Sequence, residues 1–125
     1  MKKMLVGFDG SENSKRALAE AIEIAKRFSA EITAVNVYHI PAGHDLSQRV
    51  LEKARVMLED GEVKFQLVSV LNPDTSRAIT EMAKNEKFDL IVVGHRGMSA
   101  VKAYLMGSVS KRICSESPVN ILIVK

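Results

Sequence analysis

Three glycines and a serine follow a short apolar run in the last third of the chain. The run is IVV at residues 91–93, and the spacing after it is Gly94-x2-Gly97-x9-Gly107-Ser108. Glycine tolerates positive φ and has no Cβ to hold an anion away, so such a loop before a helix can present backbone N–H groups to a phosphate. The spacing predicts a nucleotide-binding loop. The alternative is a loop whose glycines only turn tightly and pack a helix against a sheet.

A second loop with possible chemistry is Asp9-Gly10-Ser11, which follows an apolar run at residues 4–8. Asp9 could hold Mg²⁺ together with nucleotide phosphates, since one carboxylate is enough when phosphate oxygens supply further ligands. Asp-Gly is also a common turn sequence, and Ser11 is equally well explained as the N-cap of the following helix. Both interpretations stay open for this loop.

Two side chains inside the glycine loop could contact a phosphate. His95 could donate a ring N–H to it or simply face solvent, and Arg96 could supply a counter-charge or be an ordinary exposed arginine. Neither GxxxxGK[ST] nor GxGxxG is present, which excludes a P-loop NTPase and argues against a dinucleotide. The spacing of the histidines and of Cys114 indicates no nucleophilic catalysis.

Short apolar runs alternate with amphipathic segments along the whole chain. We expect strands at residues 4–8, 32–38, 63–70, 91–93 and 119–124. A first helix is expected to start at Ser11, a short second helix to lie around residues 50–58, and a third to follow a cap at Asn72 with Pro73 at its first position. The fourth helix is expected to carry a stripe of apolar residues, Val101, Tyr104, Leu105, Val109 and Ile113. This order predicts one α/β domain over residues 1–125, a single open parallel sheet with helices on both faces. Ligands bind such sheets beyond the carboxyl ends of the strands, where the winding reverses.

Composition restricts the classes of partner. The 125 residues are 46% hydrophobic, and the net charge of +3 is scattered over short basic pairs, which argues against a nucleic-acid partner. No apolar run approaches the roughly eighteen residues of a membrane helix, and no signal-peptide pattern begins the sequence, so we expect no membrane partner. The single cysteine, Cys114, rules out an internal disulfide, fits the cytoplasm, and is expected to be buried on the last helix.

These motifs together resemble the universal stress protein (UspA-like) family, in its ATP-binding branch. The resemblance covers the whole chain and rests on the glycine spacing, on LVGFDGS at residues 5–11 and on SPVNILIV at residues 117–124. It implies a five-stranded Rossmann-like sheet in the order 3-2-1-4-5. In that order the first and fourth strands are neighbours, so the Asp9 loop and the glycine loop would meet at one cleft.

The resemblance also implies roles for individual residues. Asp9 would lie near the ribose and phosphates, and the backbone of Val37 would hold the adenine edge. The residues placed around the ribose and phosphates are Gly94, Gly97, Gly107, Ser108, Val109 and Ser110, and their neighbours Gly10, Ser11, His95 and Arg96 complete the candidate set. Two positions depart from the family pattern: Asn36 stands where a histidine is frequent, and His95 where a small hydroxyl residue is usual.

The sequence therefore predicts a cytoplasmic stress-response or signalling module that binds ATP, AMP or ADP, possibly with Mg²⁺ at Asp9, and an unidentified protein partner. One alternative is a weak ATP-hydrolysing enzyme in the same cleft, for which Asp9, His95 and Arg96 are the few groups available. Another is a nucleotide-free interaction scaffold. The apolar fifth strand, Val119 to Val124, would lie at a sheet edge, which predicts a homodimer through it.

Overall fold

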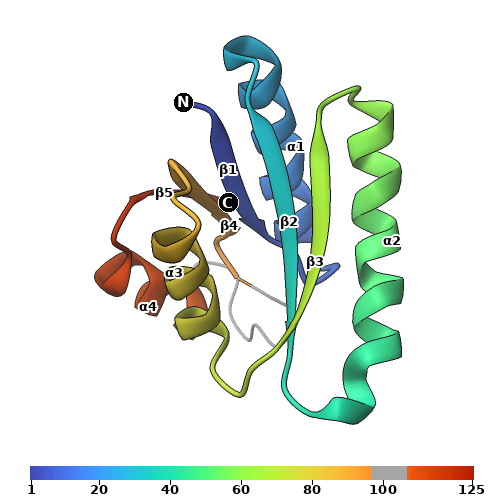
Figure 1. Cartoon of the computed structure of the whole chain (residues 1–125), viewed down its shortest axis with the longest axis vertical. Helices are drawn as coiled ribbons and strands as arrows, with labels where there is room; N and C mark the ends of the chain where they lie inside the picture. Colours follow the sequence, from blue (N-terminus) through green and yellow to red (C-terminus); the bar gives the residue numbers. More distant parts are fainter. Residues whose placement is uncertain (97–106) are drawn as a thin grey trace.

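The computed structural model of the protein describes residues 1–96 and 107–125. Its strands form one parallel sheet in the order β3-β2-β1-β4-β5, as expected (Figure 1). The strands are β1 (Lys3–Gly7), β2 (Glu31–Tyr38), β3 (Phe65–Leu71), β4 (Leu90–Gly94) and β5 (Asn120–Val124). β1 is the central strand and is hydrogen-bonded to β2 on one side and to β4 on the other.

Helices cover both faces of this sheet. They are α1 (Glu12–Phe28), α2 (His44–Asp60), α3 (Thr75–Asn85) and α4 (Ser108–Glu116), with a short 3₁₀ turn at Pro41–Gly43 before α2. One hydrophobic cluster joins α1 and α2 to one face, and a second joins α3 and α4 to the other. The parallel sheet with helices on both faces, predicted from the alternating pattern, is therefore confirmed, and so is the Rossmann-like strand order that the family resemblance implied.

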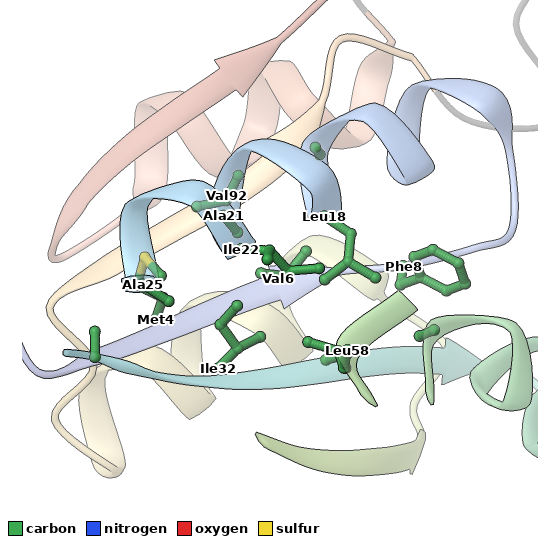
Figure 2. Packing of buried hydrophobic residues seen from close by; sticks show 14 of the residues in the cluster. Met4, Val6, Phe8, Leu18, Ala21, Ile22, Ala25, Ile32, Leu58 and Val92 are labelled. Carbon is green, nitrogen blue, oxygen red and sulfur yellow. The ribbon is translucent and has the colours of Figure 1, made fainter. Parts of the chain in front are cut away.

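The continuous apolar sequence of β1 follows from burial on both faces. On one face, Met4 lies beside Ala25 of α1 and Val6 lies near Leu18 (Figure 2), while Leu5 belongs to the cluster with Ile113 of α4 on the other face. Met4, Leu5 and Val6 are each 0% exposed. A strand with two covered faces has no reason to alternate apolar and polar residues, which is why its sequence alone could also suit a helix.

Two predicted helix starts were wrong. α2 begins at His44 and has 17 residues, because its buried stripe starts at Ser47, a polar residue that an apolar pattern does not count. α3 is capped by Asp74, whose side chain accepts from the backbone N–H of Arg77, so Asn72 and Pro73 precede the helix. The predicted N-cap of α1 at Ser11 is confirmed.

The outer face of α4 also differs from expectation. Ser110 and Ile113 are its buried residues, so the helix turns Val109 and Cys114 outward, and both are exposed. Val109 was expected to line the buried stripe and Cys114 to be buried, and both predictions were wrong. The predictions for Val101, Tyr104 and Leu105 lie outside the described residues.

The start of β1 is held by a carboxylate from the end of the α3–β4 connection. Asp89 Oδ2 accepts hydrogen bonds from the backbone N–H groups of Lys2 (2.8 Å) and Lys3 (2.9 Å). These two bonds, first Lys2 and then Lys3, lower the pKa of Asp89 below its ordinary value of 3.8. The folded chain therefore favours the ionised carboxylate, which ties the central strand to β4 at its first residue.

Asp89→Asn is expected to lower the melting temperature at pH 7 by roughly 2–6 °C, the shift that about 1 kcal/mol or less produces in a domain of this size. Because the folded-state pKa is depressed, the stabilisation is complete above the unfolded-state value and is lost as pH falls through the folded-state value. The difference between wild type and variant should therefore shrink in thermal melts as the pH falls below 3.8, the ordinary value, toward the lower folded-state value. A difference that stays constant over this range would contradict the role of the charge.

Candidate functional site

The ends of β1 and β4 lie side by side at the carboxyl edge of the sheet. Val6 is in register with Val92, and β1 connects through α1 to β2 on its other side. The winding of the sheet therefore reverses between β1 and β4, which is the position where doubly wound parallel sheets leave a crevice beyond their strand ends. This crevice is the place where the sequence predicted a ligand.

The Asp9 loop is a turn that starts α1. Asp9 Oδ1 accepts from the backbone N–H of Ser11 at 2.9 Å, and Gly10 has φ +84°, a conformation that favours glycine. Ser11 Oγ accepts from the backbone N–H of Ser14 at 3.1 Å, which is an N-cap bond. The turn and cap interpretations of Asp9 and Ser11 are both confirmed, and contact with a ligand is a separate role that these bonds do not test.

Gly94 allows the first turn of α1 to press against the end of β4. A Cβ on Gly94 would lie 2.7 Å from the carbonyl carbon of Asn13 and 2.8 Å from its oxygen, and backbone atoms cannot give way as a flexible side chain can. Among the described glycines, only Gly10 has positive φ, so Gly94 and Gly107 are not needed for a left-handed turn. The packing of α1 against β4 thus accounts for Gly94, which is the alternative to phosphate binding that the sequence left open for these glycines.

The N-terminus of α4 is fixed to the same edge. Gly107 N donates to His95 O at 2.9 Å, and Ser110 Oγ donates to Gly94 O at 2.7 Å. Gly107 is the N-cap, and none of the side chains that the structure describes caps the helix there. The first N–H groups of a helix have no partner within it, and they carry the positive end of its dipole. The first turns of α1 and α4 therefore both meet the end of β4.

The two candidate side chains in the glycine loop, His95 and Arg96, differ in burial. His95 is only 9% exposed, and its backbone N donates to Val124 O at 2.7 Å, so the alternative of a solvent-facing histidine is wrong. Arg96 is half-buried. Ser108 and Val109 are exposed at the start of α4, and the prediction for Gly97 lies outside the described residues.

Val37 turns its backbone polar groups toward the Asp9 side of the crevice. Val35 O accepts from Phe8 N at 2.9 Å, so the odd-numbered residues of β2 point their N–H and C=O groups toward β1. The next step of the ladder would join Val37 N to Phe8 O, but the paired residues end at Gly7 and Val35. The N–H and C=O of Val37 thus point beyond the end of β1.

A polar cluster beneath this crevice was missed from the sequence. Ser47 Oγ contacts Asn36 Oδ1 at 2.6 Å and Ser69 Oγ at 2.5 Å, and Asn36 Nδ2 donates to Phe8 O at 2.9 Å. A signal for it exists, because Asn36 falls on the same strand face as the buried Ile32 and Ala34. A polar residue on an apolar strand face needs partners, but the sequence does not say which.

A divalent cation could be held here only with help from the ligand. Among residues 1–96 and 107–125, no group of three or more His, Cys, Asp or Glu side chains is arranged to hold a metal ion. Asp9 offers one carboxylate at the crevice, which suits Mg²⁺ when phosphate oxygens complete its shell.

Elsewhere in the molecule, none of the helices that the structure describes is both long and apolar enough to cross a membrane.

Comparison with known proteins gives a consistent result over the whole chain. A sequence profile of the Universal stress protein family matches residues 1–125. Universal stress protein MJ0531 of Methanocaldococcus jannaschii is 32% identical, with 99% of this chain and 82% of that protein covered. A crystal structure of a universal stress protein in complex with cAMP is 30% identical, with a TM-score of 0.81 and coverage of 99% and 96%.

A more distant structure shows the fold alone. The universal stress protein from Archaeoglobus fulgidus has a TM-score of 0.86 at 17% identity, and the match covers 100% of this chain and 99% of that one. The arrangement of five strands and their helices is thus retained where few side chains are shared.

Gly94→Ala tests the packing of α1 on β4. The new methyl group would meet the Asn13 backbone at 2.7 Å, so we expect a loss of roughly 1–3 kcal/mol in the free energy of unfolding, measured by urea denaturation. Gly7→Ala is the matched control, since its Cβ would meet only side-chain atoms of Val93 and Ile79, at 3.2 and 3.3 Å. Equal losses for the two variants would contradict this explanation of Gly94.

Proposed function

The chain belongs to the universal stress protein family, and from that premise we propose that it binds an adenine nucleotide, ATP, AMP or ADP, in the crevice beyond β1 and β4. One observation carries the proposal: the unpaired edge of Val37 faces the crevice that the first turns of α1 and α4 also border. The cAMP complex of a 30% identical universal stress protein supports the same class of ligand.

The proposed binding mode uses backbone groups for both ends of the ligand. The N–H and C=O of Val37 together match the acceptor and donor on the adenine edge, and the Asp9-Gly10-Ser11 turn lies toward the ribose. The phosphates then meet the positive end of α4 at Gly107, Ser108, Val109 and Ser110, with Gly94, His95, Arg96 and Gly97 completing the loop. Asp9 is the side chain that would hold Mg²⁺ together with nucleotide phosphates.

This arrangement supports recognition better than chemistry. Backbone N–H groups and helix N-termini stabilise a bound phosphate without activating a water molecule or a leaving group. We therefore propose a binding module of the stress response that acts in the cytoplasm and alters its contacts with a protein partner when the nucleotide is bound. The weak hydrolase stays the alternative and is distinguished by phosphate release.

Nucleotide binding is tested by thermal shift and calorimetry with ATP, ADP and AMP, each with and without Mg²⁺. A ligand at about 100 times its Kd stabilises the fold by about 2.7 kcal/mol, which is a shift of several degrees. We expect this shift with at least one nucleotide, none with Mg²⁺ alone, and its loss in the double variant Gly97→Val, Gly107→Val. No shift with any nucleotide would favour the scaffold, and phosphate release that disappears in Asp9→Ala would favour the enzyme.

The edge of β5 supports a proposed homodimer. β5 lies at the end of the strand order, and its Val124 O accepts from His95 N, so the alternate residues Ile121 and Ile123 point their N–H groups away from β4. An apolar strand edge with outward N–H groups is a surface that a second copy can cover by symmetric pairing.

Ile121→Pro removes one outward N–H of β5 and leaves the hydrogen bonds to β4 in place. We expect wild type to be a dimer at micromolar concentration by size exclusion with light scattering, and Ile121→Pro to shift toward monomer. Leu71→Pro is the control, because it removes an outward N–H at the opposite edge, on β3, and should stay dimeric. A monomeric wild type, or equal dissociation of the two variants, would overturn the assignment of β5.

A further inference from the structure

A chain of hydrogen bonds runs from β3 through α2 to the end of β1. Its members are Ser69 on β3, Ser47 on α2, Asn36 on β2 and the carbonyl of Phe8, joined at 2.5, 2.6 and 2.9 Å. Ser47 is 2% exposed, so the chain lies between the sheet and α2. It connects three elements to the residue that immediately precedes Asp9.

The direction of donation in this chain is determined by its last acceptor. The Phe8 carbonyl can only accept, so the Asn36 group facing it must be the NH₂, and Oδ1 must face Ser47. Ser47 then donates its single O–H to Asn36 Oδ1, so Ser69 must be the donor in the bond to Ser47 Oγ. Every bond therefore points toward Phe8, and the opposite amide orientation would set two acceptors against each other.

The Asn36 amide donates to the same carbonyl oxygen that a continued ladder would use. In a continued parallel ladder, Phe8 O accepts from the backbone N–H of Val37, two residues after Val35. The ladder stops one step earlier, at the pair Gly7 and Val35, and the side chain of Asn36 donates to Phe8 O instead. Val37 N–H is thus left facing the crevice.

We propose that Asn36 is a positioning residue for adenine recognition: by capping the Phe8 carbonyl, it ends the β1–β2 ladder and keeps the Val37 N–H available to the base. This inference rests on the proposed function, since it assigns the selectivity of the same crevice. The acceptor for Val37 N–H is the ring nitrogen of the adenine edge, and Val37 C=O accepts from its exocyclic amine. A hypoxanthine base reverses both groups and is disfavoured.

Two variants separate this role from a purely structural one. Asn36→Leu removes the amide and leaves Phe8 O without this donor, so we expect the ladder to extend by the bond from Val37 N–H to Phe8 O. Ser47→Ala is the matched control, because it breaks the same buried chain and leaves Asn36 Oδ1 without its donor, but it keeps the Asn36 bond to Phe8. Both variants should be less stable than wild type, but only Asn36→Leu should give the Val37 N–H a hydrogen-bond acceptor within the protein. Asn36→Val, which suits a strand, replaces Asn36→Leu if that variant does not fold.

The first measurement needs no ligand. Amide hydrogen exchange of Val37, followed by NMR on the full chain, should be fast in wild type and in Ser47→Ala, and at least about tenfold slower, relative to global stability, in Asn36→Leu. Equal exchange in wild type and Asn36→Leu would overturn the proposal, whether or not a nucleotide binds.

The second measurement is base selectivity, taken as the ratio of Kd values for IMP and AMP. Wild type and Ser47→Ala should prefer AMP by about tenfold or more, and Asn36→Leu should lose most of that preference, since one complementary base-edge pair discriminates by about that factor. An unchanged ratio in Asn36→Leu would overturn the role in recognition. If wild type binds neither nucleotide, the proposed function fails. The exchange experiment then still decides whether Asn36 keeps the Val37 N–H from bonding to Phe8 O.

Discussion

The hydrogen-bonded position of β1 between β2 and β4 is the constraint on which the rest of this structure depends. β1 is buried on both faces and bonded on both edges, and its last ladder bond to β2 is made by Phe8 N. Because neighbouring parallel strands end at one edge, the point where β1 stops determines which groups of β2 and β4 stay exposed there. The position of the crevice is therefore a consequence of strand length and order.

Much of this architecture could be predicted from local sequence, and the failures have a common cause. Buried strands are visible as apolar runs, and Ser11 marks the start of α1 because capping is a local interaction. The start of α2 and the outer face of α4 were mistaken because Ser47 and Ser110 are buried polar residues. Their burial depends on acceptors in other strands, which no local period contains.

The glycines show the same limit at the site itself. The sequence treated them as one motif, but the structure uses Gly10 for positive φ, Gly94 for contact with Asn13 and Gly107 as the N-cap of α4. The sequence around Val37 gives even less indication of a binding role, because the proposed contacts use its backbone and not its side chain. Its N–H and C=O face the crevice because the β1–β2 ladder has ended, which depends on where β1 stops and on Asn36.

A site made largely of backbone groups depends on the side chains that place the backbone. Gly94 brings the first turn of α1 to β4, and Ser110 ties α4 to the Gly94 carbonyl. Asn36 places the backbone of β2 in the same way, by donating a hydrogen bond to Phe8 O at the point where the β1–β2 ladder ends. The fold itself persists at 17% identity with a TM-score of 0.86, so the strand order that brings these backbone groups together does not require most of the side chains of this chain.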